Sequence, residues 1–345
     1  MVAQGGGRRA FIGSFTAAGG PGVVTAAVAA SGGTLTVVGS VDGVPDPSYL
    51  ALSPDGAMLY AVSETADGAV AAYRVNGRTA ELAGPPVPVG GSGPTHLSVF
   101  GGHVLTANYG SGSVTAVPLR PDGRLAPAPS CLLRHSGAGP HERRQRGPHA
   151  HQVQPDPSGR WVVSVDLGTD SVRVCALTDG DLLLHREIAL RPGSGPRHLT
   201  FHPDGTHAYV VNELTPTVTV CHWDAATGSL KPLAQTPVLA DAPAADAYPS
   251  GIVVAPDGRF VWTATRGEDV LSVLAVEENG ARLRLVGTVA CGGHWPRALT
   301  FHDGCLYVAN ERSGDVTWFR VHPETGLPQR GGAIEVPAAA CVVFH

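Results

Sequence analysis

The sequence has few charged residues and no long basic segment. Lys and Arg number 24 against 29 Asp and Glu, the formal net charge is −5, and charged residues make up only 15% of the chain. Nucleic acids and anionic membrane surfaces attract proteins that display basic patches. Neither is therefore expected as a partner, and nothing in the sequence indicates an obligate protein partner.

Long apolar segments are also absent. No stretch of about 18 apolar residues occurs, and the N-terminal segment MVAQGGGRRAFIG lacks the apolar centre of a secretion signal. The cysteines are scattered without a C-x-x-C pair, a pattern typical of reduced thiols in a protein core. These are Cys131, Cys175, Cys221, Cys291, Cys305 and Cys341. We therefore expect a cytoplasmic protein.

Several catalytic signatures are missing as well. The chain contains no G-x-S-x-G, no H-E-x-x-H, no P-loop and no G-x-G-x-x-G placed between a strand and a helix. A conventional serine hydrolase, zinc peptidase or nucleotide-dependent enzyme is thereby excluded. No cofactor is expected.

One short phrase, in contrast, occurs six times. Each copy begins with Pro, continues through alternating apolar residues, often turns at Pro-Asp-Gly and ends in a β-rich segment that closes on a polar residue. A period of about fifty residues built of strand, tight turn and strand is typical of propeller blades. The copies begin at Pro47, Pro94, Pro148, Pro196, Pro249 and Pro296.

The two ends of the chain resemble the two halves of a seventh copy. The segment AFIGSF from Ala10 reads like the second half of the phrase, and CVVFH from Cys341 matches the end of the first half. We predict an all-β fold, a seven-bladed β-propeller whose last blade is closed by strands from both termini, with residues 1–345 as a single domain. A β-sandwich or two unrelated β domains is the alternative, but neither explains the matching termini.

The repeat also predicts which polar residues converge. Equivalent positions in successive blades lie at equal radius and height, and the start of one strand lies beside the end of its antiparallel partner. The column after each anchor proline is Ser48, Thr95, His149, Arg197, Ser250 and Arg297. The column that ends the next strand is Glu64, Tyr109, Leu167, Glu213, Arg266 and Glu311, preceded by Ser63, Asn108, Asp166, Asn212, Thr265 and Asn310.

These columns predict a polar site at one mouth of the central channel. A single Arg at a blade end is more often an ion-pairing surface residue than a ligand, and Glu64 and Glu311 are expected to pair with a neighbouring Arg. Several Arg, a His and a Glu in one concave site, however, repel one another and lose hydration unless a ligand compensates. The joint pattern therefore favours a functional mouth.

A basic insertion precedes one copy of the phrase. Residues 134–147 (RHSGAGPHERRQRG) contain Arg143, Arg144 and Arg146 and lie on the same face as the mouth. They form either a lid that contributes cations to an anionic substrate or a solvated loop. His151 follows His149 by two positions, but no carboxylate or third His has the spacing to complete a metal site, so no metal is expected.

At these residues the chain resembles a known family. The segments GPHAHQVQPDPSGRWVVSVDLG, GSGPRHLTFHPDG with NEL, and YPSGIVVAPDGRFVWTATRG are similar to the propeller lactonases, which include 6-phosphogluconolactonase and the carboxymuconate cyclases. The resemblance implies a catalytic set of His149, Arg197, Glu213 and Arg266. We expect the substrate also to contact His151, His198, Asn212, Arg297, Arg143, Arg146 and Tyr109.

The resemblance implies hydrolysis of a small anionic lactone, with 6-phosphogluconolactone of the pentose phosphate pathway as the expected substrate. We expect Glu213 to activate water, His149 to pass a proton to the leaving alkoxide, and Arg297 or the loop arginines to hold the phosphate. A muconate-type cyclase or a lactonase for another acid is an alternative. A non-catalytic scaffold is another, but scaffolds present apolar rims whereas this mouth is ionic.

Overall fold

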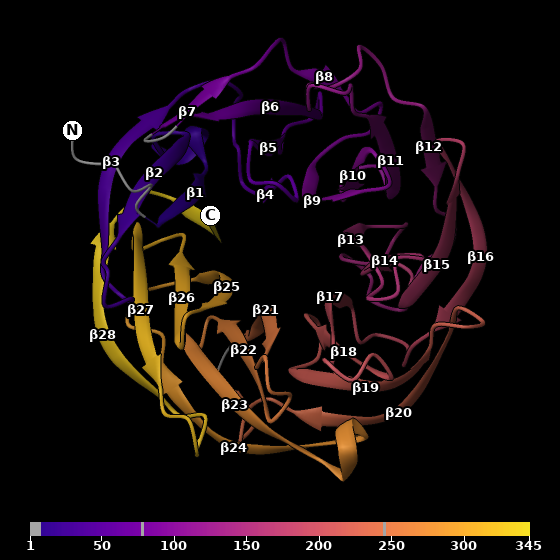
Figure 1. The fold of residues 1–345 in the computed structure, drawn as a ribbon. Helices are drawn as coiled ribbons and strands as arrows, with labels where there is room; N and C mark the ends of the chain where they lie inside the picture. The colour runs from indigo at the N-terminus through magenta and orange to yellow at the C-terminus, as the bar shows by residue number, and fades with distance from the viewer. Residues whose placement is uncertain (1–7, 77–78, 244–245) are drawn as a thin grey trace.

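The strands form seven blades arranged in a ring around a central channel (Figure 1). The structure is a computed structural model that describes residues 8–76, 79–243 and 246–345. Each blade is an antiparallel sheet of four strands, and one blade gains a short fifth strand, β8. The predicted seven-bladed propeller is thus confirmed.

In the first three blades after the closing one, the strands run outward in the following order. The first contains β4 (Leu50–Leu52), β5 (Met58–Ser63), β6 (Ala69–Asn76) and β7 (Thr79–Leu82), with β8 (Val87–Pro88) also paired to β6. The second contains β9 (Pro94–Phe100), β10 (His103–Asn108), β11 (Ser113–Pro118) and β12 (Cys131–Arg134). The third contains β13 (Ala150–Pro155), β14 (Val162–Asp166), β15 (Ser171–Thr178) and β16 (Asp181–Ala189).

The remaining blades follow the same plan. The fourth contains β17 (Pro196–Phe201), β18 (His207–Asn212), β19 (Thr217–Asp224) and β20 (Ser229–Pro237). The fifth contains β21 (Tyr248–Val254), β22 (Phe260–Arg266), β23 (Val270–Glu277) and β24 (Arg282–Ala290). The sixth contains β25 (Pro296–His302), β26 (Cys305–Asn310), β27 (Asp315–Val321) and β28 (Pro328–Glu335). The closing blade contains β29 (Ala339–Phe344), β1 (Arg9–Ser14), β2 (Val23–Val28) and β3 (Leu35–Val41).

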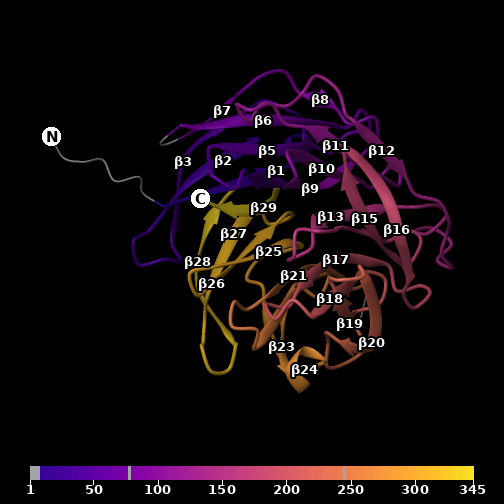
Figure 2. The same ribbon diagram turned by 45° about the vertical axis from the view of Figure 1, so that its right-hand side comes forward.

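The closing blade combines both ends of the described chain. β29 is its innermost strand and pairs antiparallel with β1, for example Ile12 with Val342 and Ala10 with Phe344. Figure 2 labels β29 beside β1, and Figure 1 shows the C-terminal end of the chain beside β1. The predicted closure by strands from both termini is confirmed, and it leaves no unpaired innermost strand in the ring.

The hydrophobic core is divided among the interfaces between blades. One cluster joins Ile12 and Val24 of the closing blade to Tyr307 of β26, and another joins Phe11 to Leu59 of β5. Five further clusters connect the remaining neighbours in the same way. Because a blade buries its faces only against its two neighbours, each blade depends on a closed ring.

Tight turns and bulges set the register of the inner hairpins. In three of the Pro-Asp-Gly turns the glycine has a positive φ of 70 to 74°, which a side chain would strain: Gly56, Gly205 and Gly258. At the other end of the hairpin, the pairing passes from Pro196 opposite Asn212 to His198 opposite Val211, so Arg197 is an unpaired bulge residue. A bulge redirects its side chain out of the ladder.

The bulges correct the sequence alignment of one blade. In β13 the register places Ala150 opposite Asp166 and Gln152 opposite Val165, so His151 is the counterpart of Arg197. We had aligned His149 with Arg197. That alignment was wrong because this blade has extra residues between Pro148 and its bulge. The strand pairing shows these residues, but an alignment on the anchor proline does not.

The two helical segments are single 3-10 turns, η1 (Thr16–Ala18) and η2 (Glu278–Gly280). No helix within the described residues is long and apolar enough to cross a membrane.

Deleting residues 339–345 should destabilise the protein severely. The deletion removes β29 and with it buried Ala339, Cys341 and Val342 from two interblade clusters. Losing several buried aliphatic side chains costs more than about 5 kcal/mol, so we expect insoluble protein or a melting temperature lower by at least about 10 °C. Thermal unfolding by circular dichroism measures this, with deletion of exposed His345 alone as the control. An unchanged melting temperature after the longer deletion would refute this closure.

Candidate functional site at one mouth of the channel

Glu213 is the centre of a buried ionic cluster at one mouth. It follows β18 directly, and its Oε2 lies 3.0 Å from Arg197 Nε and 2.7 Å from Arg266 Nη2. Its Oε1 accepts a hydrogen bond from Arg144 Nη2. Glu213 is only 3% exposed, so three guanidinium groups from three different segments surround one buried carboxylate.

The charges of this cluster stabilise one another. Burial raises the pKa of Glu213, but Arg266, Arg197 and Arg144 outweigh burial and lower this pKa to about 2. Burial and neighbouring Arg266 lower the pKa of Arg197 to about 9, which still leaves it charged at neutral pH. Three positive charges against one negative charge leave an excess of positive charge, which is suited to an anionic ligand.

Two arginine N–H groups of the cluster make no well-aligned hydrogen bond with a described residue. Arg197 Nε and Arg266 Nη2 are buried and close to Glu213, yet neither N–H has a hydrogen-bond acceptor in good geometry among the described residues. Arg197 Nη1 donates to the Ser250 carbonyl at 2.5 Å, and Arg266 Nε donates to the Tyr248 carbonyl at 3.2 Å. Both guanidiniums are thus held in place with donor capacity left for a ligand.

Arg297 belongs to a separate, neutralised group. Its Nη2 lies 3.0 Å from Glu64 Oε2 and its Nη1 lies 3.4 Å from Glu311 Oε2. The guanidinium also lies over the Phe15 ring at 4.7 Å, and Ser48 donates to Glu64. The expected pairing of Glu64 and Glu311 with an Arg is confirmed. Arg297 therefore contributes no excess positive charge to the mouth.

His149 lies at the rim, fixed in orientation. It is half-buried, its backbone N–H donates to Asp166 Oδ1, and its ring stacks on Tyr109 with centroids 4.4 Å apart. Its Nδ1 lies 2.8 Å from the Tyr109 carbonyl oxygen, which requires Nδ1 to carry the proton. The lone pair of the neutral ring is therefore on Nε2, which has no hydrogen bond to a described residue.

The basic loop contributes one arginine to the cluster. Arg144 reaches Glu213 and also lies 3.3 Å from the Tyr109 hydroxyl, which links Glu213 to the His149 stack. Gln145 beside it is fully buried and donates to the Leu167 carbonyl, which anchors the loop. Arg143 and Arg146, which we had expected to contact substrate, are exposed at the surface of the loop. Repeat alignment did not distinguish Arg144 from them because the loop has no counterpart in other blades.

Other predicted residues lie deeper than the mouth. Asn212 is fully buried, and its side-chain N–H groups donate to Thr217 and Thr219 within its own blade. That position offers a substrate no access, so its predicted substrate contact has no geometric support. His198 is buried beneath the mouth, whereas His151, the counterpart of Arg197, is buried beside Tyr109 with ring centroids 5.4 Å apart.

Two aromatic residues of the rim were missed by the sequence analysis. The backbone N–H groups of Glu213, Glu311 and Leu167 donate to Gly195, Trp295 and His149, so these three acceptors are equivalent. Trp295 adopts a φ of +65°, a conformation that Gly195 adopts without strain. Arg266 lies over Trp295 at 5.6 Å and over Tyr248 at 6.0 Å. Tyr248 and Trp295 each directly precede an anchor proline. A repeat column taken at the position before that proline would have included both.

Within residues 8–76, 79–243 and 246–345, no group of three or more His, Cys, Asp or Glu side chains is placed to hold a metal ion.

Comparisons with known proteins agree with the seven-bladed fold. A family model described as "Lactonase, 7-bladed beta-propeller" matches residues 9–344. A 6-phosphogluconolactonase from Bacillus subtilis (strain 168) is 36% identical over 307 residues, 87% of this chain and 87% of that protein.

Solved structures are similar along nearly their whole length. A Bacteroides fragilis protein, provisionally described as a 6-phosphogluconolactonase, has a TM-score of 0.92 at 28% identity and covers 100% of this chain and 99% of its own. The periplasmic gluconolactonase of Pseudomonas aeruginosa has a TM-score of 0.88 at 27% identity, with 98% of each chain covered.

Replacing Glu213 with Gln should destabilise the fold by about 2 to 4 kcal/mol, because three arginines then lose their buried counter-charge. Since the pKa of Glu213 falls from 4.5 to about 2 on folding, its stabilisation is complete above pH 4.5 and is lost as pH decreases towards 2. Urea unfolding at several pH values should therefore show the wild type and Glu213→Gln converging at low pH. Glu324→Gln, at an exposed site, is the matched control. A difference that does not depend on pH would contradict the charge-based role.

Proposed function

Because this chain belongs to the seven-bladed β-propeller lactonase family, we propose that it hydrolyses 6-phosphogluconolactone to 6-phosphogluconate at the ionic mouth. The main support is the excess positive charge around Glu213 beside a histidine with an available Nε2. An anionic lactone requires a cationic binding site, and hydrolysis requires a base for water.

In this proposal His149 is the base. Water attacks the lactone carbonyl carbon while His149 Nε2 accepts a proton from it. The ring C–O bond then breaks, and the leaving alkoxide takes that proton from His149, which gives a free hydroxyl and a carboxylic acid. The acid then releases its proton to solvent and becomes the carboxylate. The hydrogen bond at Nδ1 holds the ring in the required tautomer throughout.

Glu213 takes a different role from the one that we expected from the sequence. A carboxylate with a pKa near 2 is a weak base at neutral pH, and both of its oxygens are in contact with arginines. In this proposal Glu213 instead positions Arg197 and Arg266. Their remaining donors then stabilise the oxyanion that forms when water adds to the carbonyl.

We place the phosphate of the substrate at the aromatic side of the rim. Arg312 is exposed and its guanidinium carbon lies 3.3 Å from the Trp295 ring centroid, with Arg266 on the same ring. Arg297, which we had expected to hold the phosphate, is neutralised by two glutamates. An arginine without a counter-charge binds a phosphate dianion more strongly.

A second candidate substrate is an unphosphorylated sugar lactone. The similar Pseudomonas aeruginosa protein is described as a periplasmic gluconolactonase, so neither the phosphate nor the cytoplasm follows from family membership. We keep the phosphorylated lactone as the proposed substrate because the mouth has more arginines than carbonyl polarisation requires. We also keep the cytoplasm as the proposed location. Ring-closing chemistry and a scaffold role have no specific observation in their favour.

Replacing His149 with Gln should lower kcat by at least about a hundredfold, the usual contribution of a general base. KM should change little because the arginines remain. The measurement is the loss of 6-phosphogluconolactone, corrected for its spontaneous hydrolysis. His222→Gln, on the exposed side of β19, is the matched control. A His149→Gln enzyme with wild-type kcat would assign the base elsewhere.

Replacing Arg312 with Ala should raise KM for the phosphorylated lactone by about ten- to a hundredfold, the loss of one charge-assisted contact. KM for unphosphorylated gluconolactone should remain within about twofold. Arg320→Ala, another exposed arginine, provides the control. Equal changes for both substrates would mean that Arg312 does not recognise phosphate.

A further inference from the structure

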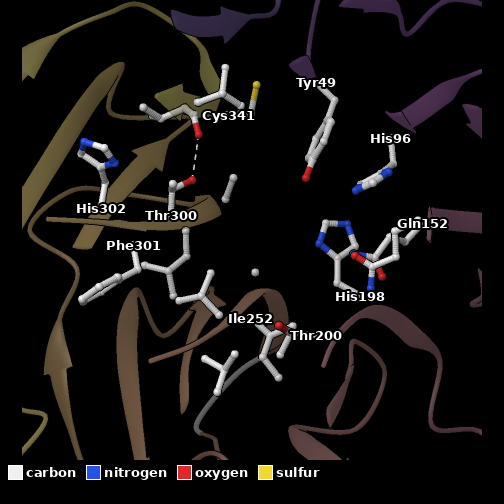
Figure 3. Close-up of a pocket in the computed structure, with 18 of the residues that line it drawn as sticks. Tyr49, His96, Gln152, His198, Thr200, Ile252, Thr300, Phe301, His302 and Cys341 are labelled. Carbon is white, nitrogen blue, oxygen red and sulfur yellow. Dashed lines mark hydrogen bonds between the residues drawn. The ribbon is translucent and has the colours of Figure 1, made fainter. Parts of the chain in front are cut away.

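A second cavity lies in the central channel below the ionic mouth. Its volume is about 570 Å³, and Tyr49, His96 and His198 line one side of it (Figure 3). Ile252, Phe301 and other apolar residues line the opposite side. This cavity is larger than a few ordered waters require and falls within the range of small-molecule sites.

The repeat explains the composition of its wall. In five blades the residue that follows the bulge position lines this cavity, and these residues are His96, Gln152, His198, Ala298 and Cys341. The other two blades contribute Tyr49 and Gly251 to the lining. Four consecutive blades thus supply hydrogen-bonding side chains, and the other three supply small residues. At these positions the polar residues are therefore confined to one half of the ring, and Thr300 and His302 of β25 also line the cavity from the other half.

A belt of interblade contacts separates this cavity from the mouth. Arg197 donates to the Ser250 carbonyl at 2.5 Å, Ser250 Oγ donates to the Pro296 carbonyl at 2.5 Å, and Thr95 donates to the His151 carbonyl at 3.4 Å. The innermost strands run from the mouth towards the other face, where Pro256 and Phe344 line the far end of the cavity. Access is therefore from the face opposite the proposed hydrolytic site.

The wall has no formal charge. None of its lining residues is Asp, Glu, Lys or Arg. Burial and nearby Arg197 lower the pKa of His96 to about 3, and the same two causes lower the pKa of His198 well below its usual value. Both imidazoles are therefore neutral at physiological pH. A neutral wall of this kind has no charge with which to attract an anion.

One polar atom of this wall is buried without a partner. His96 Nδ1 is buried, on a side chain only 4% exposed, and has no hydrogen bond to any described residue. The Tyr49 hydroxyl points into the space between the two walls (Figure 3). A buried polar atom without a partner costs about 1 to 3 kcal/mol, so the cavity favours an occupant that can hydrogen-bond with this wall.

We propose that this cavity binds an uncharged polyhydroxylated ligand, a monosaccharide or polyol. Hydroxyl groups of such a ligand can both donate to and accept from the Tyr49, His96, Gln152 and His198 side chains. Its C–H face packs against the apolar wall formed by residues such as Ile252 and Val253. Water satisfies only the first wall, whereas a sugar matches both.

The site is separate from the proposed hydrolytic mouth, although one contact crosses the belt. His198 Nε2 lies 3.5 Å from Arg197 Nη1. Binding in the cavity should therefore not compete with anions at the mouth.

The test uses D-glucose and D-glucitol as probes in calorimetric titrations of the full chain. We expect saturable binding that inorganic phosphate, which is attracted to the cationic mouth whatever its substrate, does not displace. Thr200 lines the cavity, so Thr200→Phe should weaken binding at least tenfold, about 1.4 kcal/mol. Thr200→Val, which keeps the volume, should remain within about threefold of the wild type.

A second variant keeps the test valid if the Thr200→Phe protein does not fold. Val253→Phe fills the cavity from the opposite wall and should have the same effect. Saturable binding of neither probe, displacement by phosphate, or a soaked crystal with only ordered water in the cavity would each overturn the proposal. Because binding is measured without turnover, these outcomes are independent of whether 6-phosphogluconolactone is the substrate.

Discussion

The pairing of β29 with β1 is the constraint on which the rest of the structure depends. Each hydrophobic cluster lies between two blades, so no blade has a core of its own. The mouth and the cavity are also shared between blades, because the mouth combines residues from several hairpins and the cavity is lined from all seven blades. Opening the ring would therefore weaken the core, the mouth and the cavity together.

Charge distribution separates the channel into two chemically distinct compartments. At the mouth, three arginines surround Glu213 and leave an excess of positive charge. One residue deeper along each inner strand, the wall is uncharged, and Arg197 itself helps to keep His198 neutral by lowering its pKa. The boundary lies at the bulges of the inner strands. In β17 the bulge directs Arg197 towards Glu213 and the next residue, His198, into the cavity.

The sequence predicted a large part of the site, with errors that have physical causes. Arg197, Glu213 and Arg266 lie at repeat positions, and the structure brings them together. Arg144 could not be selected from its neighbours because its loop has no repeat equivalent, and only tertiary contact with Glu213 distinguishes it from exposed Arg143 and Arg146. His149 was assigned to the wrong column because an anchor proline marks the phrase but does not report the hydrogen-bond register.

The sequence by itself determined the number of blades, their closure by both termini and the face on which the polar columns converge. These follow from a periodic pattern, since equal spacing along the chain becomes equal position around the ring. Only the tertiary structure decided which arginine is neutralised and which retains excess charge, because that depends on distances between residues such as Arg297 and Glu64, which are far apart in sequence. It also decided the basicity of Glu213: a carboxylate in contact with three guanidiniums is a weak base, and the sequence does not show how many of them reach it.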